Sequence, residues 1–526
     1  MTLAGTGNLI RFLLRVSRVR IVLWIAGIAL LVWFTAVSVD RLYPTQADLD
    51  AAAAPLYGNT AIIAMLGPPY ALNTLGGQIV FQLGAFGFAT MGLMGMFLVG
   101  RHTRADEEDG RTELLRATVV GRNAPVTAAL LVACAAVAVT GVLISLSMLS
   151  LALPVEGSLI YGAAMAAFGI FFACVTAVMA QVSEHNRTAY GLTGALLGLS
   201  YLLRAVGDAG SGTLSWLSPM GWAQQVRAYA DERWWPLLLL VAGSAVLVAA
   251  TYGLLARRDL GGGLVAPRPG PPEAAPWLGR PWGLTLRLQR ASLVGWALGL
   301  LVFGVAYGAL GKDINDFVGG NQAVEDLIAQ GQGSLTDTYF ATSLLTMALI
   351  TAGFAIASIL RLRSEETSGS AEQLLATRLS RPQWAVSHLA MAAGGSVVIM
   401  AATGLGLALA YGVSIRDLSD LPELVVAAVA FAPALWVLVA LGLALFGVAP
   451  KAVAVTWGAL AGCFVIGLFA QLLNLPSWVV DLSPFQHVPA MPADDFALAP
   501  LLALTAVAAA LSAVGLVGFR RRDAGY

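Results

Sequence analysis

Apolar stretches of about 20 residues recur along the chain, separated by short polar segments. A helix needs about 20 mostly apolar residues to cross the hydrocarbon core of a bilayer. Measured against that length, the sequence predicts twelve spans, at residues 19–39, 79–99, 126–153, 159–181, 188–206, 235–255, 291–310, 341–360, 385–413, 425–447, 454–474 and 499–519. The predicted fold class is therefore an all-α integral membrane protein of about twelve transmembrane helices.

Composition supports lipid as the solvent of this chain. Of its 526 residues, 58% are hydrophobic and 11% are charged, whereas a soluble domain carries about 25% charged residues. The net charge is zero, which gives no indication of a nucleic-acid partner. Cys134, Cys174 and Cys463 lie inside apolar stretches and have no Cys or His spacing typical of a metal site. We expect contact with membrane lipid, and neither nucleic acid nor bound metal.

Basic residues predict the orientation, because cytoplasmic loops of membrane proteins are enriched in Lys and Arg. With the N-terminus inside, 24 of the 30 basic residues fall on the inner side. The other six lie outside, namely Arg41, Arg204, Arg227, Arg233, Lys312 and Arg416. Both termini are therefore predicted to be cytoplasmic. The basic, amphipathic residues 5–20 lead into a full-length span, which predicts a retained first helix rather than a removed signal peptide.

The two halves of the chain repeat one another. Residues 106–122 align without a gap on residues 365–381, a shift of 259 positions (365 − 106). Seven identities result: Glu107/Glu366, Gly110/Gly369, Glu113/Glu372, Leu115/Leu374, Ala117/Ala376, Thr118/Thr377 and Arg122/Arg381. Leu-Ser-Pro at 217–219 recurs at 482–484, and Arg-Arg-Asp at 257–259 recurs at 521–523.

This repeat predicts the domain organisation. Residues 1–260 form a first six-helix half, residues 261–290 a cytoplasmic Pro/Gly-rich linker, and residues 291–526 a second six-helix half. Six spans per half is an even number, so both halves have the same orientation. A pseudo-twofold axis along the membrane normal would relate two such parallel repeats.

Each repeated acidic segment follows the second span of its half, on the predicted cytoplasmic side. Asp109 and Ser368 are favourable N-cap residues, and Glu113 and Glu372 fall in the first turns, where the helix dipole favours carboxylates. The sequence predicts a helix of about three turns in each segment, lying along the membrane surface. Two such copies with leucines among their charges indicate docking elements for a two-fold cytoplasmic partner. The alternative is an ordinary solvated loop that obeys the positive-inside rule.

The pattern Glu-Glu-x-x-Gly-x-x-Glu-x-Leu-x-Ala-Thr-x-x-x-Arg, with Asp106 at its first position in the first copy, resembles the first cytoplasmic loop of ABC-2-type exporter permeases. In that family the loop holds the coupling helix that docks on the nucleotide-binding subunit. The resemblance implies coupling roles for Asp106, Glu107, Glu113, Leu114, Leu115, Arg116, Thr118, Glu365, Glu366, Glu372, Leu374, Leu375 and Thr377. The second copy has Thr367 and Ser368 in place of acids and Arg378 in place of an apolar residue, so unequal binding of the partner is expected.

A wider pattern extends the resemblance to nearly the whole chain. The Leu-Ser-Pro loop, Trp234-Trp235-Pro236 and the Arg-Arg-Asp-Leu-Gly-Gly-Gly run from residue 257 are similar to the double-length permeases of actinobacterial polyketide-antibiotic and multidrug exporters, of the tetronasin-resistance kind. This implies a permease subunit, in the bacterial plasma membrane, that exports hydrophobic or amphipathic small molecules such as antibiotics or drugs. It also implies two copies of a separate ABC ATPase subunit, which would bind ATP and Mg; this chain itself is expected to bind no cofactor.

The sequence also indicates which chemistry this chain does not perform. A Walker A loop needs Gly-x-x-x-x-Gly-Lys-Ser/Thr, but the lysines of this sequence are Lys312 and Lys451, and Asp313 follows Lys312. Its outer acidic residues are dispersed without metal-ligand spacing. The chain is therefore predicted not to be an enzyme, and ATP hydrolysis is expected on another subunit.

The alternative function is a secondary drug exporter driven by an ion gradient. Such proteins need a carboxylate or histidine in the membrane interior, and no Asp or Glu falls inside a predicted span. His388 lies near the start of a span and His185 in a short inner loop, and local hydrogen bonds are expected for both. Arg204 and Asp208, at an outer helix end, are expected to pair.

Family analogy places the second and fifth spans of each half along the substrate path. In this sequence the side chains concerned are mostly aromatic or methionine, which repack around varied apolar ligands. The candidates are Phe81, Gln82, Phe86, Phe88, Met91, Met94 and Tyr201 in the first half and Met347, Phe354, Phe464 and Phe469 in the second. The alternative for each is lipid-facing or interhelical packing.

Overall fold

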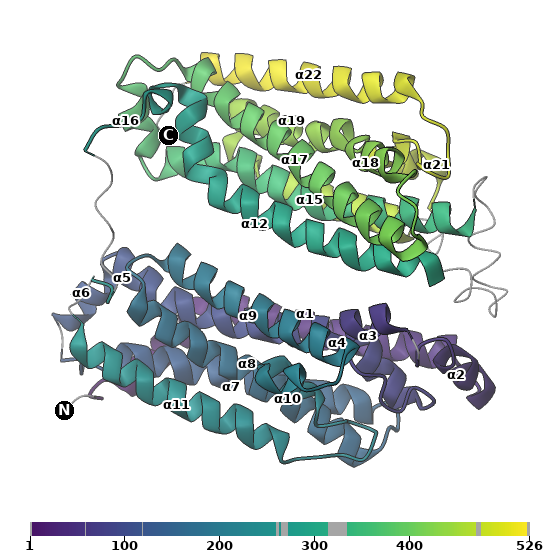
Figure 1. Cartoon of the computed structure of the whole chain (residues 1–526). Coiled ribbons are helices and arrows are strands. Elements are labelled where there is room, and N and C mark those ends of the chain that lie inside the picture. Colours follow the sequence, from purple (N-terminus) through teal and green to yellow (C-terminus); the bar gives the residue numbers. More distant parts are fainter. Residues whose placement is uncertain are drawn as a thin grey trace. The chain divides into compact units, whose positions relative to one another are not determined.

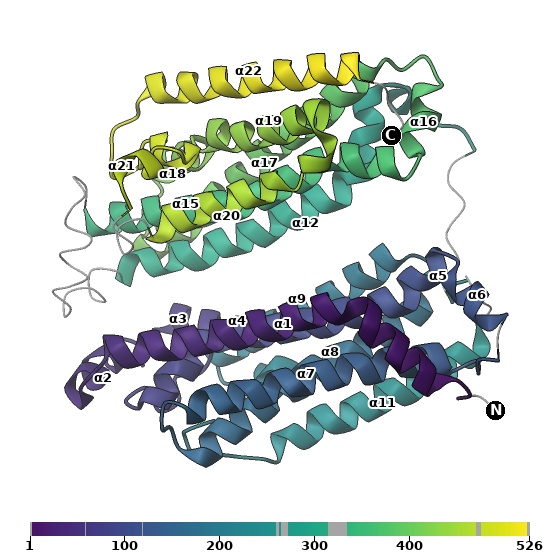
Figure 2. The same ribbon diagram turned by 180° about the vertical axis from the view of Figure 1, so that it is seen from behind.

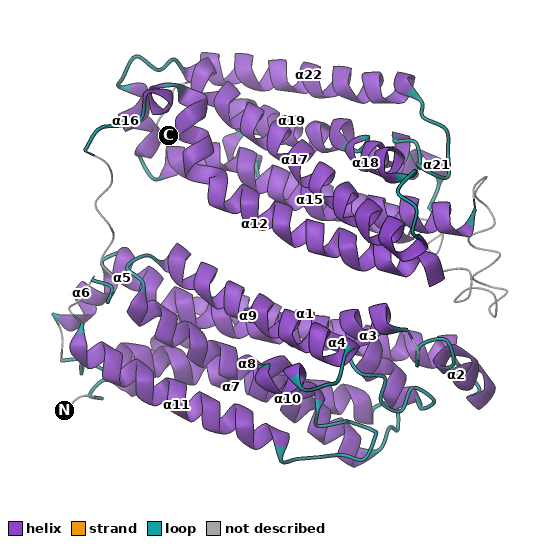
Figure 3. Ribbon diagram, viewed as in Figure 1, coloured by secondary structure: helices purple, strands orange, loops and turns teal. Residues whose placement is uncertain are grey.

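The computed structural model describes residues 3–57, 59–117, 119–258, 262–264, 272–313, 334–469 and 475–522. Within these ranges the chain is helical and has no β-strand (Figure 3). It divides into two compact units, Met1–Gly270 and Pro271–Tyr526 (Figure 1). The prediction of an all-α fold is confirmed.

Helix α8 is the central helix of the first unit. It packs against α4, α7 and α11, while α1 packs against α4 and α7 (Figure 2). The bounds of the long helices are α1 Thr6–Leu42, α4 Leu75–Gly100, α7 Ala124–Leu149, α8 Val155–Val182, α9 Asn186–Ala209 and α11 Pro236–Arg257. Three short helices, α2 (Gln46–Ala53), α3 (Thr60–Leu66) and α10 (Pro219–Gln224), lie in the connections.

The second unit repeats this order of helices. Its elements are α12 Pro281–Leu310, α15 Leu335–Thr367, α16 Ser370–Leu375, α17 Arg381–Ile415, α18 Leu421–Val429, α19 Ala432–Val448, α20 Val455–Phe469, α21 Ser477–Val480 and α22 Leu498–Arg521. The contacts are equivalent as well, because α12 packs on α17 as α1 packs on α7, and α19 packs on α15 and α22 as α8 packs on α4 and α11. The repeat in sequence is thus a repeat in structure.

Glycines allow the closest helix contacts in both units. A Cβ at Gly95 of α4 would lie 2.3 Å from the carbonyl oxygen of Gly169 in α8, and one at Gly304 of α12 would lie 2.2 Å from that of Thr403 in α17. Lipid tails are as apolar as leucine side chains, so helices in a bilayer associate largely through such close backbone approach. A larger side chain at either position would separate the two helices.

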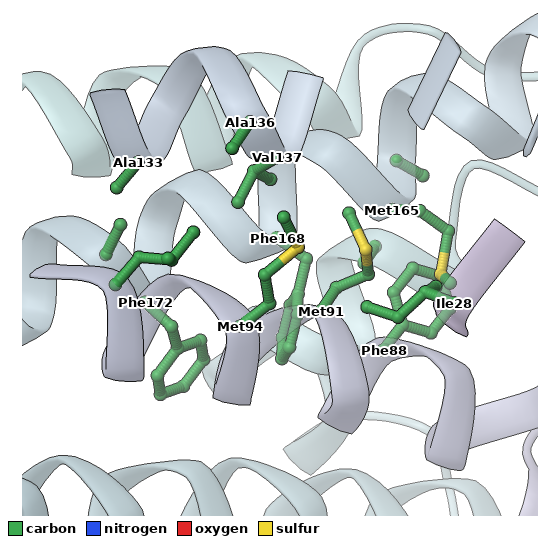
Figure 4. Close-up of a cluster of buried hydrophobic side chains, with 14 of the residues drawn as sticks. Ile28, Phe88, Met91, Met94, Ala133, Ala136, Val137, Met165, Phe168 and Phe172 are labelled. Carbon is green, nitrogen blue, oxygen red and sulfur yellow. The ribbon is translucent and has the colours of Figure 1, made fainter. Parts of the chain in front are cut away.

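Around these contacts, large side chains fill the core of the first unit. Phe88, Met91 and Met94 of α4 pack against Phe168 and Phe172 of α8 (Figure 4). The rings of Phe88 and Phe168 meet edge to face, with centroids 5.6 Å apart. All five side chains are nearly inaccessible to solvent.

Among the described residues, eleven helical stretches are long and apolar enough to cross a membrane, with α18 and α19 counted together as Leu421–Val448, and the apolar helix Val455–Gly467 is shorter. This agrees with a protein of about twelve membrane helices, with different boundaries. Helix α1 begins at Thr6 and not at residue 19, because the basic amphipathic lead continues the helix without a break. Helix α12 begins at Pro281, within the predicted linker, of which residues 261 and 265–271 fall outside the described ranges.

Two long connections, residues 47–76 and 313–337, have no role that the sequence indicates. Residues 47–76 contain α3, whose C-terminal carbonyls at Ile63 and Met65 accept hydrogen bonds from the Arg204 guanidinium, each at 3.2 Å. Helix α4 is interrupted beside it at Gly84 (φ 41°, ψ −141°). A Cβ at Gly84 would lie 2.5 Å from the carbonyl oxygen of Leu66, so this approach of α3 requires glycine. Most of the segment 313–337 is not described.

Candidate functional site

The first repeated acidic segment folds as a broken turn after α4. The helix continues through a π-helical stretch, Arg101–Ala105, into α5 (Asp106–Glu108), stops at Gly110 (φ 71°) and resumes as α6 (Arg111–Arg116). Residues 104–117 are called the first charged turn from here on. The predicted three-turn helix is wrong, because the acids belong to the end of the preceding helix and the new helix has six residues.

The second copy has the same construction. Helix α15 runs through Glu365 and Glu366 to Thr367, the chain reverses at Gly369 (φ 75°), and α16 follows. Residues 363–376 are called the second charged turn. Glycine tolerates a positive φ that side chains with a Cβ disfavour, which explains why each helix ends at the repeated glycine. The N-cap predicted at Ser368 is therefore wrong; the residue before α16 is Gly369, which makes no side-chain cap.

Two arginines surround Glu107 in the first charged turn. The Glu107 carboxylate lies 2.6 Å from Nη1 of Arg104, one turn earlier, and 2.5 Å from Nη2 of Arg258, just past the end of α11. Only 8% of the Glu107 side chain is exposed, and the two arginine side chains are 1% and 4% exposed. Arg104 also donates to the carbonyl oxygen of Glu184 at 2.6 Å, and Arg258 donates to Oε1 of Gln181 at 2.7 Å.

The equivalent carboxylate in the second charged turn, Glu366, has equivalent partners. It lies 2.7 Å from Nη1 of Arg363 and 2.7 Å from Nη2 of Arg522, which follows α22. The Arg522 guanidinium also stacks over Phe446 and Phe519, with 4.8 and 5.4 Å to the ring centroids. The last helix of each unit is thus tied to the charged turn of the same unit through one glutamate and two arginines.

A third arginine repeats in both units. Arg122 donates to the carbonyl oxygens of Leu255 and Arg258, at 2.7 and 3.1 Å. In the second unit Arg381 donates to the carbonyl oxygen of Arg522 at 2.8 Å. Each arginine caps the C-terminal end of the last helix, where free carbonyls favour a cation. The internal repeat aligns Arg122 with Arg381 but does not predict their contacts. Their recurrence at the repeat shift is the one sequence signal that marks these two arginines as structurally important.

Buried ion pairs of this kind fix the charged turn and the end of the last helix relative to one another. Removing one member of such a pair costs about 3–5 kcal/mol, because the other charge is left without compensation. A displacement of either charged turn therefore displaces the end of the last helix with it, or breaks the pair. The arrangement suits the transfer of movement between a turn and a helix bundle.

The short helices expose their outer faces. Glu113 and Leu114 in α6 are exposed, Leu114 to 75%, and Glu372 in α16 is exposed. Leu374 and Leu375 are half-buried against a core cluster of the second unit. Among the remaining predicted coupling residues, the side chains of three are not described, namely Leu115, Arg116 and Thr118. The others make internal contacts.

Asp106 and Glu365, the first acids of each segment, make internal contacts. Asp106 Oδ1 lies 2.8 Å from Nη1 of Arg111, and Glu365 Oε1 lies 2.9 Å from Nε of Arg361. Thr377 Oγ1 donates to the carbonyl oxygen of Leu374 at 2.6 Å. The predicted coupling set is therefore a mixture of anchoring and exposed residues.

Histidines lie beside these acids, in local contacts as predicted. His388 Nε2 is 3.3 Å from Oε2 of Glu365, and His185 Nδ1 is 3.2 Å from Oε1 of Glu108. At the opposite end of the first unit, Arg204 and Asp208 form the predicted pair, with Nη1 to Oδ2 at 3.7 Å.

The residues predicted for the substrate path differ in burial within their own units. Met91, Met347 and Phe354 lie in helix packing, while Gln82, Phe86 and Phe464 are exposed, and the side chain of Phe469 is not described. Tyr201 donates its hydroxyl to the carbonyl oxygen of Met65. Two of them, Phe81 and Phe88, line a cavity of about 30 Å³ in the first unit, which is the size of one water molecule.

Known proteins resemble the chain over nearly its whole length. It is 42% identical over 523 residues, 99% of this chain and 95% of the relative, to the multidrug efflux system permease protein Rv1217c of Mycobacterium tuberculosis. A family described as the C-terminal domain of multidrug efflux system permease Rv1217c matches residues 278–520, from just before α12 to the last turn of α22. The chain therefore belongs to the family of the multidrug efflux system permease Rv1217c.

Proposed function

We propose that this chain is the membrane permease of an ATP-driven exporter of the ABC-2 type, and that its two charged turns receive a separate ATPase subunit. The observation that carries the proposal is the pair of equivalent turns, each locked to its own helix bundle through Glu107 or Glu366. Each turn also presents a short helix with an exposed face, α6 or α16, next to these ion pairs. Two such surfaces match a partner with two copies of one binding site, as an ABC ATPase dimer has.

The roles within each turn follow from exposure. Glu113, Leu114 and Glu372 are exposed and form the contact with the ATPase. The buried glutamates anchor the turn and transmit its movement to α11 and α22. Closure of the ATPase dimer by ATP would move both turns together, and each turn would carry the end of its last helix with it. Both turns face the cytoplasm in this proposal, in agreement with the basic residues.

The description of the relative supports drugs as the transported molecules. Rv1217c is described as a multidrug efflux permease, and we propose that this chain exports hydrophobic or amphipathic drugs or antibiotics, including polyketides. Which molecule it prefers would follow from ATPase assays over a ligand panel. The cavity at Phe81 and Phe88, of about 30 Å³, is smaller than such cargo.

The test is charge reversal at the exposed acids, Glu113→Lys together with Glu372→Lys, in the chain expressed with the ATPase that copurifies with it. We expect normal membrane insertion and loss of drug-stimulated ATP hydrolysis. The matched control is Asp40→Lys with Asp495→Lys, two exposed acids outside both charged turns, which should leave the activity unchanged. Normal drug-stimulated hydrolysis in the first variant would refute the docking role.

A second measurement separates the proposal from export driven by an ion gradient. Transport into inverted vesicles should require ATP and should continue when an uncoupler dissipates the proton gradient. Transport that stops with the uncoupler while ATP remains high would identify a secondary exporter instead.

A further inference from the structure

A crevice opens between α1, α4 and α9 in the first unit, next to the first charged turn. Its volume is about 320 Å³. The residues that matter here are Arg20 and Trp24 of α1, Phe97 of α4, Arg101 of the π-helical stretch, and Asn186 and Tyr190 of α9. We refer to it as the α1–α9 crevice.

One end of this crevice is cationic. Arg20 is exposed and Arg101 is half-exposed, and neither lies within 4.0 Å of a carboxylate in the part of the chain that the structure describes. The neighbouring arginines behave differently, since Arg104 and Arg111 both pair with acids. Two uncompensated guanidiniums at one crevice attract an anion, and phosphate suits their donor geometry.

The other end of the crevice is aromatic. The ring of Trp24 stacks on Phe97 with centroids 6.1 Å apart, and Tyr190 meets Phe97 edge to face at 5.3 Å. Arg20 stands at the polar end of the apolar run of α1, and Trp24 lies one turn further into it. Tryptophan and arginine at this depth are typical of the boundary between headgroups and acyl chains.

A buried acceptor adds specificity. Asn186 lines the crevice, and its largely buried side-chain oxygen has no hydrogen-bond partner among the described residues. A buried polar atom without a partner is costly, so a donor from a bound molecule would stabilise it. A headgroup hydroxyl supplies such a donor, and a choline headgroup does not.

We propose that the α1–α9 crevice binds an anionic phospholipid with a hydroxylated headgroup. Its phosphate lies between Arg20 and Arg101, a headgroup hydroxyl donates to Asn186, and an acyl chain lies along Trp24 and Phe97. Basic pockets between membrane helices commonly hold such headgroups. Lipid binding in this crevice needs no ATPase, so it is independent of the proposed function.

The second unit provides a contrast. Its crevice of about 430 Å³ beside α12 is lined by apolar and small residues, including Gly295, Trp296 and Phe303, and by no charged side chain. Arg287 and Arg290 lie on the exposed surface of the same helix. These two arginines therefore share the general attraction of basic residues to anionic lipid without forming a crevice.

The experiment titrates the full-length chain in detergent with phosphatidylglycerol carrying brominated acyl chains, which quench tryptophan fluorescence on contact. The Trp24→Phe variant identifies the share of quenching that comes from the crevice. In Arg20→Gln/Arg101→Gln we expect about 30-fold weaker binding at Trp24, since each basic contact contributes about fivefold. The control Arg287→Gln/Arg290→Gln should bind as the unchanged protein does.

Several outcomes would overturn the proposal. These are unchanged quenching in Arg20→Gln/Arg101→Gln, equal quenching by brominated phosphatidylcholine, and displacement of the lipid by inorganic phosphate, which would indicate a site for a free anion. If the double glutamine variant fails to fold, Arg20→Lys/Arg101→Lys replaces it. That variant keeps both charges and should retain selectivity for phosphatidylglycerol over phosphatidylcholine.

Discussion

The two charged turns share one anchor but differ in what surrounds it. In the first turn, Glu108 accepts a hydrogen bond from the backbone nitrogen of Asn186 at 2.9 Å, and Arg104 donates to the carbonyl oxygen of Glu184. The first turn is therefore attached to α11 and also to the connection between α8 and α9. In the second turn the residue equivalent to Glu108 is Thr367, whose hydroxyl bonds to the carbonyl oxygen of Arg363 in its own helix.

The second turn has a different additional attachment. Glu365 contacts His388 of α17 at 3.3 Å and lies 3.3 Å from Nε1 of Trp384. Its neighbour Arg522 stacks on aromatic rings of α19 and α22. The first turn thus depends on more polar, better buried contacts, and the second on aromatic packing and on partly exposed charges. Two elements that a symmetric partner would treat as equal are therefore expected to differ in stiffness.

Neutralising the anchor carboxylates should give the largest difference between the units. Glu107→Gln leaves Arg104 and Arg258 buried without a counter-charge, and we expect a loss of about 3–5 kcal/mol. Glu366→Gln leaves Arg363 and Arg522 uncompensated, but these side chains are 25% and 16% exposed, so water screens them and we expect about 1–2 kcal/mol. Thermal unfolding of the full-length chain in detergent measures both.

Asp495→Gln is the control for that comparison, because its side chain is exposed in the loop before α22. It should leave the unfolding temperature unchanged. Equal losses for the two anchor variants, or a larger loss for Glu366→Gln, would show that burial does not separate the two turns.

A double-mutant cycle sharpens the comparison by isolating one contact. We expect Arg258→Gln and Glu107→Gln to be less harmful together than the sum of the single changes, with a coupling of about 1–3 kcal/mol. The same cycle on Arg522 and Glu366 should give a smaller coupling, because part of the Arg522 contribution comes from the two aromatic rings. Additive effects in the first cycle would mean that the ion pair does not tie α11 to the turn.

Exchanging Glu108 of the first turn and Thr367 of the second should have the smallest effect on stability. Glu108→Thr gives the first turn the residue of the second and removes the acceptor at the start of α9. Loss of such a helix-end acceptor costs about 1 kcal/mol. Hydrogen exchange at the amide of Asn186 should become faster, while Thr367→Glu should leave the amides at the start of α20 unchanged. Unchanged exchange in Glu108→Thr would place the attachment elsewhere.

Hydropathy predicted the all-helical fold and its approximate number of spans because both depend on local pattern. Span length follows from the thickness of a bilayer, and eleven of the twelve spans have long apolar helices, while α20 is described only as far as residue 469. The boundaries were less accurate. The helical lead of α1 and the first turns of α12 are polar, and hydropathy does not detect a helix that continues beyond its apolar part.

In the charged turns, the sequence predicted the location of the segments but neither their helix boundaries nor their anchoring contacts. The repeat identified both segments, but an N-cap pattern at Asp109 competed with the glycine that follows it, and the glycine determined the break. The anchors could not be predicted, because Glu107 and Arg258 are 151 positions apart and only the folded bundle brings them together. The residues proposed for the substrate path have no repeat or polar signal in the sequence, so their assignment still rests on family analogy alone.

Cross-linking from equivalent positions tests the central claim, that both turns receive the same partner. Leu114 of α6 and Gln373 of α16 are separated by the repeat shift of 259 (373 − 114), and both are exposed. Leu217 and Leu482, the first residues of the two Leu-Ser-Pro motifs, are 265 positions apart (482 − 217) and form an exposed control pair before α11 and α22. With a photoreactive amino acid at each position in cells, we predict adducts to one ATPase from both Leu114 and Gln373 and none from the controls. Adducts from neither turn, or equally from the controls, would contradict the account.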